Sequence, residues 1–344
     1  MFEIRDSKKG VKQFIKKIIS SFSNVSDIFV FYNKKNIAIR TNEQIKQFKS
    51  KDGYNKLIYN YFYNLLSNIE KEKLLKEDTL DKAYKVEDTI IRLHFYTEVS
   101  GKALAIRLKK STVDKLSKLG FNKKDFKELL NAKSGLVIIA GPHGSGKSTT
   151  VASFLTEYAS LHNAHIITIE DPIEYIFTDT KSFFSQKEIE TNTSSFNKAL
   201  KDALRESPDV IFISETRTKE LAQELIRTSL TGKLVLSTLH SNNMIATIER
   251  IINLLDGNKT DFVNVLKVVI NQRLIPTKEG LKLIYEKLDM NADIKEIVLN
   301  SRNLSQELLT YIKQSNIQTI DTKLEILFNQ GLIDNKTLEG YSVY

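Results

Sequence analysis

A glycine-rich loop near residue 147 has the residue types that bind phosphate groups. It fits the pattern G-x-x-x-x-G-K-[ST], and its residues are Gly141, Pro142, His143, Gly144, Ser145, Gly146, Lys147 and Ser148, followed by Thr149. Glycines in such a loop bring backbone N–H groups close to phosphate oxygens. Lys147 would pair with the β- and γ-phosphates, and the Ser148 hydroxyl would bind Mg²⁺. The loop therefore predicts a site for ATP and Mg²⁺.

Three further polar groups come at or just beyond the ends of short apolar runs. They are Glu170, Glu215 and His240. The carboxyl ends of strands in a parallel sheet face the ligand, so we expect these side chains to lie beside the phosphates. Glu215 would hold Mg²⁺, directly or through water. Glu170 would polarise a water molecule or hold a metal, and His240 would sense the γ-phosphate.

The elements that must position these groups form an alternating pattern. Four short runs are rich in apolar and β-branched residues: 135–140, 165–169, 210–213 and 233–236. Helical stretches separate them. Strands that are buried on both faces have this composition, and their alternation with helices predicts a parallel, doubly wound α/β sheet. We expect this core to span residues 112–275.

The residues on either side of this core differ from it. Residues 1–111 carry two hairpin signals, the second over 89–108, and apolar positions at helical spacing over 54–76. They predict a small α+β domain. From residue 276 onward the pattern is largely helical, so residues 276–344 are predicted to form a helical segment packed on the core.

Arginine is scarce in this chain, with 10 Arg against 41 Lys, so we expect it where a planar, forked cation is needed. Arg92 and Arg107 lie on the two arms of the second predicted hairpin. A two-residue turn would place both on one face, where they repel each other unless an anion lies between them. Both arginines are candidates for clamping a phosphate. The alternative is a pair of solvated arginines.

Composition excludes several classes of protein. The 344 residues include no cysteine, which excludes disulfides, a thiolate nucleophile and cysteine-based zinc sites. No apolar run approaches the roughly 18–20 residues that span a bilayer. Residues 1–6 lack the basic-then-apolar pattern of a signal peptide. We therefore expect a cytoplasmic protein without zinc.

The net charge of +9 is concentrated in two blocks. Residues 1–50 carry +7 and residues 101–150 carry +8. This local excess argues against direct nucleic-acid binding. The second block leads into the phosphate loop. The first block is either a solvated lysine-rich face or a contact for an acidic protein or an anionic membrane surface.

Several motifs together resemble one known family. Beside the loop over 141–150, they are the stretches 168–174, 203–209, 231–240 and 271–274. These stretches resemble the type II/type IV secretion ATPases, and most of all the PilT-like pilus retraction ATPases. The stretches 26–28 and 39–40 are similar to the family's PAS-like N-terminal domain. Residues 286–298 lie where the family has a helical C-terminal motif.

The resemblance implies a RecA-like core after a PAS-like N-terminal domain, in a homohexameric ring. It implies that Glu170 orients the attacking water, that Glu215 is the acidic residue beside Mg²⁺, and that His240 is the second His-box histidine. Arg92 and Arg107 match arginines that the family directs at the nucleotide. Lys233 stands where the first His-box histidine is usual.

The resemblance also implies a partner and a location. The partner would be a platform protein of the inner membrane, and the ATPase would sit peripherally at the cytoplasmic base of a type IV pilus, where it drives retraction and twitching motility. Three alternatives stay open. The first is a motor of the same family that drives pilus assembly, type II secretion or a competence pilus. The second is a RecA-like nucleic-acid translocase, and the third is a nucleotide-gated regulator without useful turnover.

Overall fold

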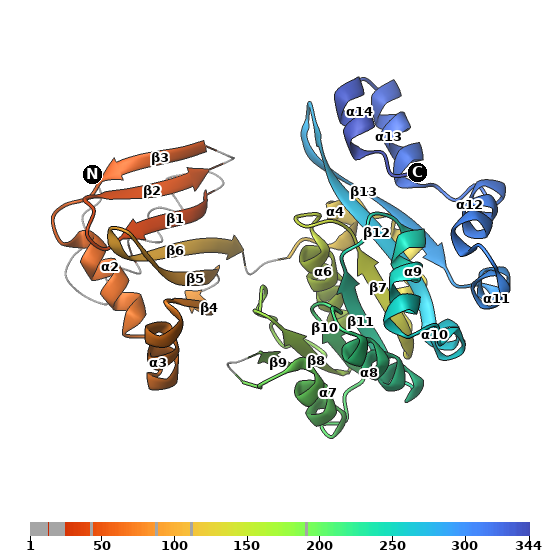
Figure 1. The fold of residues 1–344 in the computed structure, drawn as a ribbon, viewed down its shortest axis with the longest axis horizontal. Helices are drawn as coiled ribbons and strands as arrows, with labels where there is room; N and C mark the ends of the chain where they lie inside the picture. The colour runs from red at the N-terminus through yellow and green to blue at the C-terminus, as the bar shows by residue number, and fades with distance from the viewer. Residues whose placement is uncertain (1–12, 14–24, 42–43, 87–88, 111–112, 190–191) are drawn as a thin grey trace. The chain divides into compact units, whose positions relative to one another are not determined.

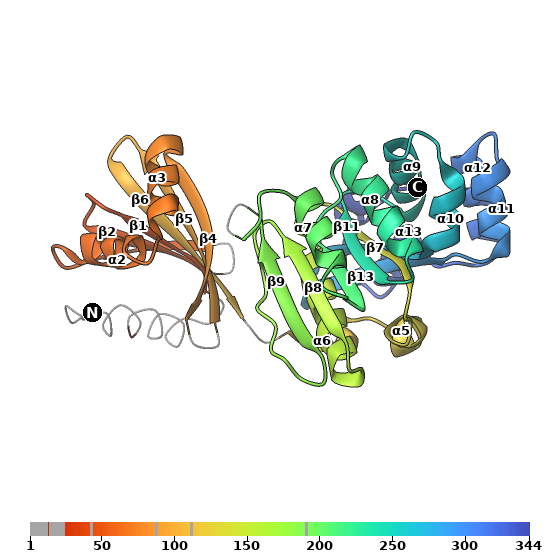
Figure 2. The ribbon, with the colours of Figure 1, turned by 90° about the horizontal axis from the view of Figure 1, so that it is seen from below.

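The chain consists of two compact units. The computed structural model describes residues 13, 25–41, 44–86, 89–110, 113–189 and 192–344. The first unit comprises residues 1–112 and 172–176, and the second comprises residues 113–171 and 177–344. Figures 1 and 2 draw the elements of both units. The predicted boundary at residue 111 and the separation of a helical segment stay predictions.

An antiparallel sheet with two helices on one face forms the first unit (Figure 1). The strand order is β3-β2-β1-β6-β5-β4. Its elements are β1 (Val25–Phe31), β2 (Asn36–Thr41), β3 (Gln44–Lys49), α2 (Tyr54–Tyr63), α3 (Asn68–Glu77), β4 (Thr79–Val86), β5 (Thr89–Glu98) and β6 (Gly101–Lys110). Alternate strand residues such as Ile28 and Val30 are buried against helix residues such as Phe62. This period of two confirms the predicted α+β domain.

The helix predicted over 54–76 is two helices. The Ser67 side chain accepts a hydrogen bond from the backbone of Glu70, and the Glu70 side chain accepts one from the backbone of Ser67. This reciprocal capping box begins α3, so the chain leaves the first helix after residue 63 and starts again. The spacing of apolar residues continued across the break and concealed it.

A seven-stranded sheet forms the centre of the second unit. Its order is β13-β12-β7-β11-β10-β8-β9, and every neighbouring pair is parallel except β12 with β13. The strands are β7 (Gly135–Ala140), β8 (His165–Glu170), β9 (Phe183–Glu188), β10 (Val210–Ile213), β11 (Leu234–Leu239), β12 (Leu266–Thr277) and β13 (Gly280–Asp289). The four predicted core strands correspond to β7, β8, β10 and β11. The predicted α/β fold class is confirmed.

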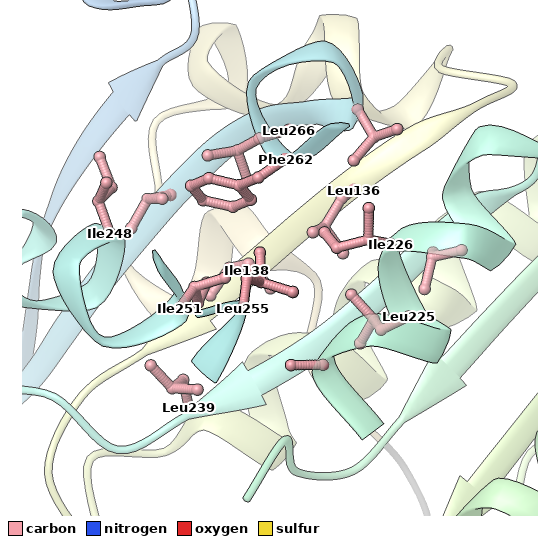
Figure 3. Close-up of a cluster of buried hydrophobic side chains, with 14 of the residues drawn as sticks. Leu136, Ile138, Leu225, Ile226, Leu239, Ile248, Ile251, Leu255, Phe262 and Leu266 are labelled. Carbon is pink, nitrogen blue, oxygen red and sulfur yellow. The ribbon is translucent and has the colours of Figure 1, made fainter. Parts of the chain in front are cut away.

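Helices cover both faces of this sheet (Figures 1 and 2). On one face lie α4 (Leu116–Leu119), α5 (Lys123–Leu130) and α6 (Lys147–Leu161). On the other lie α7 (Phe196–Leu204), α8 (Lys219–Leu230), α9 (Met244–Leu254), α10 (Lys259–Val265), α11 (Ala292–Asn300) and α12 (Leu304–Gln314). Figure 3 shows Leu136 and Ile138 of β7 in the second of these cores. Val137 and Ile139 point to the first core, so β7 is buried on both faces.

The expectation that the chain is largely helical from residue 276 onward is wrong for residues 280–289. These residues form β13, which pairs with β12 through a turn at 278–279. The apolar residues there recur at positions 281, 284, 285 and 288, which is the i, i+3, i+4, i+7 spacing of a helix, so the sequence pattern does not reveal this strand. The helices α13 (Ile320–Asn329) and α14 (Asn335–Tyr341) pack on this hairpin through Ile275 and Ile284. Among the described residues, no helix is both long and apolar enough to cross a bilayer.

Candidate nucleotide-binding site

The predicted phosphate loop connects β7 to α6, which is the strand-to-helix context that its pattern requires. Gly141 has a φ of 150° and Gly146, the N-cap of α6, has a φ of 85°. A Cβ atom at Gly141 would lie 2.4 Å from the Gln272 carbonyl oxygen. The loop therefore needs glycine, and its backbone passes directly into a helix N-terminus. This cradle fits the phosphates of a nucleotide.

Lys147 is held at the mouth of the loop. The residue is 9% exposed, and its Nζ donates hydrogen bonds to the carbonyl oxygens of Gly141 and Pro142, each at 2.9 Å. These contacts fix a positive charge beside the first turn of α6. Both the ammonium and the helix N-terminus attract phosphate oxygens.

His240 connects Lys147 to Glu215. Its Nδ1 lies 3.4 Å from Lys147 Nζ, and its Nε2 lies 3.4 Å from Glu215 Oε1. A lysine ammonium can only donate hydrogen bonds, so Nδ1 must be the acceptor and the ring proton must sit on Nε2. Burial, followed by the charge of Lys147, lowers the pKa of His240 below its ordinary value. A neutral imidazole with its proton directed at the carboxylate satisfies both neighbours.

Glu215 remains ionised in this network. Burial would raise its pKa, but the hydrogen bond from Arg217, the adjacent His240 ring and the positive charges of Arg217 and Lys147 lower that pKa below its usual value. Arg217 Nη2 lies 2.8 Å from Glu215 Oε2. The carboxylate is thus anionic at neutral pH. A negative charge is what a carboxylate needs in order to bind or orient a metal ion beside the phosphates.

Ser148 and Glu215 provide oxygen donors, which Mg²⁺ prefers. Among the described residues, no three or more His, Cys, Asp and Glu side chains cluster closely enough to hold a metal ion. Mg²⁺ typically uses one or two protein ligands together with substrate phosphates and water. The donor set therefore fits a magnesium ion that is bound together with a nucleotide.

Glu170 lies at the same edge of the sheet. It is the last residue of β8, the neighbour of β10, and it is 4% exposed. The Thr168 hydroxyl donates a hydrogen bond of 2.7 Å to its Oε1. The carboxylate is therefore fixed at the end of β8, next to β10, the strand that precedes Glu215.

A cavity of about 800 Å³ opens beside the phosphate loop. Its lining includes Pro142, His143, His240, Glu249 and Arg250. The rings of His143 and His240 are stacked with centroids 6.1 Å apart. His143 thus presents an imidazole to the same space as His240, on the side of the loop that faces α9.

Arg92 and Arg107 lie in the first unit, opposite each other in the β5–β6 ladder. They share one face across a two-residue turn, as predicted. Each guanidinium has its own carboxylate: Arg92 Nε lies 3.1 Å from Asp81, and Arg107 Nε lies 2.8 Å from the buried Asp27. These aspartates supply the anions that two neighbouring arginines need. The clamping role of the arginines stays a prediction.

Lys233 lies away from the nucleotide-binding edge. It precedes β11, whereas His240 follows the same strand. Six residues at about 3.3 Å each separate the two ends by about 20 Å. Lys233 therefore lies at the opposite end of β11 from the groups beside the phosphate loop.

Sequence reasoning missed the residues that hold these loops. Gln272 Nε2 donates a hydrogen bond of 2.7 Å to the Ser145 carbonyl oxygen, and Arg273 Nη2 donates one of 3.0 Å to the Asn242 carbonyl oxygen. Both belong to a motif that the sequence analysis noted without a role. The available signal was the occurrence of Asn, Gln and Arg together inside an apolar strand.

Comparisons with known proteins agree with this geometry. The family model for the type II/IV secretion system protein matches residues 5–307. A twitching motility protein of Neisseria gonorrhoeae is 34% identical over 250 residues, which cover 70% of this chain and 67% of that protein. The Pseudomonas aeruginosa type IV pilus ATPase PilT is 27% identical over 307 residues, 87% of this chain and 89% of PilT.

Solved structures point in the same direction. A crystal structure of the pilus retraction motor PilT with bound ADP superposes with a TM-score of 0.85 at 33% identity, covering 97% of each chain. The predicted resemblance and the predicted ATPase activity are confirmed. The chain belongs to the type II/IV secretion system protein family and is a PilT-like ATPase.

Proposed function

We propose that this protein is an Mg-ATP-hydrolysing motor that retracts type IV pili. The observation that carries the proposal is the connected set Lys147–His240–Glu215 at a phosphate loop. Its placement in a chain that is similar over nearly its whole length to a pilus retraction motor supports this direction of movement. We further propose that six copies form a ring at the cytoplasmic base of the pilus, in contact with a platform protein of the inner membrane.

The residues of the site have distinct roles in this proposal. Lys147 and the loop amides bind the phosphates, while Ser148 and Glu215 would hold Mg²⁺. The metal, when bound, neutralises charge on the phosphates. Glu170 orients the water that attacks the γ-phosphate in line. His240, which lies between Lys147 and Glu215, reports whether the γ-phosphate is in place.

The two arginines of the first unit complete the proposed reaction. Arg92 and Arg107 would close on the γ-phosphate when the first unit moves toward the nucleotide. Such arginines stabilise the charge of the transition state. Movement of one unit against the other, repeated around the ring, would be the mechanical step.

The test of the proposal is the number of pili on cells that carry Lys147→Ala at the native locus. The matched control is Lys133→Ala, which removes an exposed lysine ahead of β7. Purified Lys147→Ala protein is expected to lose ATP hydrolysis. Cells that carry it are expected to bear more pili than the parent and to lose twitching.

Two other outcomes would reject the direction of the motor. Bare cells would mean that the protein assembles pili. An unchanged pilus number would mean that pili are not its substrate, and stimulation of hydrolysis by DNA, weakened by salt, would then indicate a translocase.

A further inference from the structure

The β12–β13 hairpin contacts both loops of the nucleotide site. Asn271 pairs with Ala140 at the end of β7, so the following residues of β12 extend past β7 beside the phosphate loop. Across the antiparallel ladder, Asn271 faces Glu286 of β13. Asn271, Gln272 and Glu286 are fully buried. Polar side chains in the middle of a buried hairpin cost free energy unless they bond to specific partners.

One face of the hairpin holds the phosphate loop. The bond from Gln272 Nε2 to the Ser145 carbonyl spans residues far apart in the sequence. The Gln272 backbone also closes on Gly141, where no Cβ would fit. The loop is therefore packed against β12 at two points.

The opposite face holds the residues that follow His240. Asn271 Nδ2 donates to the Ser241 carbonyl oxygen at 3.2 Å, and Arg273 Nη2 donates to the Asn242 carbonyl oxygen at 3.0 Å. Side chains alternate along a strand, so Asn271 and Arg273 share the face that Gln272 does not. The segment 241–242 is thereby fixed to β12.

Glu286 extends this arrangement to a second helix. Its Oε1 accepts the N–H of Met244, the first residue of α9, at 2.6 Å. Its Oε2 accepts the N–H of Ile320, the first residue of α13, at 3.0 Å. One carboxylate thus binds the N-termini of two helices, where a negative charge is favourable.

Residues 343–344 bind at the same place. The Tyr344 hydroxyl lies 3.0 and 3.1 Å from the two oxygens of Glu286. Asp321 in the first turn of α13 accepts the N–H groups of Val343 and Tyr344 at 2.8 and 3.0 Å. The Glu286 carboxylate therefore joins α9, α13 and residues 343–344 at one point.

The charges around Glu286 make this junction sensitive to its partners. The pKa of Glu286 is raised to about 7, because burial and the charge of Asp321 together outweigh the three donors, which lower it. Arg273 and Lys323 are the cations that interact with it. A buried carboxylate that loses one hydrogen-bond donor still bears the free-energy cost of its burial. The position of the Glu286 carboxylate therefore depends on each of its three donors.

We propose that Glu286 is a positioning residue that makes the placement of His240 depend on residues 320–344. Met244 is four residues after His240, and the segment between them is already bound to β12. A shift of α13 or of Tyr344 would move the carboxylate and, with it, the start of α9. The effect on catalysis rests on the proposed role of His240 in hydrolysis.

Tyr344→Phe tests this link because it removes one donor and keeps the ring. The matched control is Tyr311→Phe, which removes the hydroxyl that accepts a 2.7 Å bond from Asn291. For the full chain we would measure the kcat of ATP hydrolysis, the Kd of Mg-ADP, and hydrogen exchange of the amides of residues 240–246. Exchange reads the position of the loop without requiring turnover.

Tyr344→Phe is expected to lower kcat by about tenfold and to speed exchange at 240–246 by about tenfold, a typical effect at a coupled position. The Kd of Mg-ADP should change by less than about twofold, since the phosphate loop is held from the other face. Tyr311→Phe should change none of the three.

Unchanged kcat together with unchanged exchange in Tyr344→Phe would overturn the inference, and so would equal effects of the two variants. If the unmutated protein hydrolyses no ATP, the proposed function fails. The exchange comparison would still decide whether Tyr344 and Glu286 position the loop.

Discussion

Polar side chains of the second unit are placed in two ways. Glu215 and His240 follow the carboxyl ends of parallel strands, and their side chains are 17% and 36% exposed. Asn271, Gln272 and Glu286 lie in the middle of the antiparallel β12–β13 pair, and none of them is exposed. The first group can reach a ligand. The second group can reach only protein.

Their hydrogen bonds differ in the same sense. The strand-end side chains contact other ionisable side chains, such as Lys147 with His240. The mid-strand side chains contact backbone groups of Ser145, Ser241 and Met244. The reactive side chains thus lie at the edge of the parallel sheet. The antiparallel β12–β13 pair holds the loops on which these side chains stand. We expect substitutions at the edge to lower turnover and substitutions in the hairpin to lower stability.

The largest expected effect comes from two arginines of the first unit. It would show that the contrast between strand-end and mid-strand side chains holds only in the second unit. Arg92→Ala and Arg107→Ala remove mid-strand side chains of the first unit that are 33% and 54% exposed. If they clamp the γ-phosphate, kcat should fall by about 10³–10⁵-fold, while nucleotide binding stays detectable. Steady-state hydrolysis and nucleotide titration measure the two effects.

A matched control for the arginines is Lys46→Ala, which removes an exposed cation from β3 of the same sheet. It should leave kcat unchanged. Near-normal turnover in both arginine variants would reject the clamp. The two arginines would then serve only in their ion pairs with Asp81 and Asp27.

A smaller effect is expected at the edge of the parallel sheet. Glu170→Gln keeps the size of the side chain and removes the negative charge that orients water, so kcat should fall by about 10²–10⁴-fold. The melting temperature should stay close to that of the unmutated protein, because Thr168 can still donate to the amide oxygen. Glu224→Gln, which removes the negative charge from an ion pair with Arg227 on α8, is the control.

A large loss of stability in Glu170→Gln without loss of turnover would mean that Glu170 has a structural role, like the buried mid-strand residues of β12 and β13. The comparison would then fail at the strand end where the sequence motif is strongest. Stopped-flow hydrolysis and thermal unfolding of the same preparations separate the two results.

The strand-end residues could be predicted because their signals are local. An apolar run followed by Glu215, or by the loop that holds Lys147, gives both the strand and its end in a few adjacent residues. The same locality made β7, β8, β10 and β11 predictable. Residues 280–289 were mistaken for helix because their apolar residues at 281, 284, 285 and 288 recur three and four positions apart, which is the spacing of one face of a helix.

The hairpin residues could not be predicted, since their partners are far away in the sequence. Gln272 bonds to a residue 127 positions earlier, and Glu286 bonds to residues 42 and 34 positions away on either side. A buried polar residue in an apolar strand indicates that some partner exists. Only the register of β12 with β7 and β13 determines which partner it is.

The smallest expected effect concerns stability and pH at Glu286. The folded-state pKa of about 7 lies above the ordinary value of 4.5, so the folded chain binds a proton that the unfolded chain has released between these pH values. The contribution of this group is therefore fully present below pH 4.5 and is lost as pH rises through 7, by an amount on the order of 3 kcal/mol.

Glu286→Gln does not titrate in this range. Thermal unfolding between pH 4.5 and 8 should therefore show the stability of the unmutated protein falling relative to that of the variant as pH rises. Parallel curves would mean that the Glu286 carboxylate is already ionised near pH 4.5, with its donors compensating the burial in full. In that case the hairpin would hold α9 and α13 with a fixed charge, and the junction would respond to Tyr344 but not to protons.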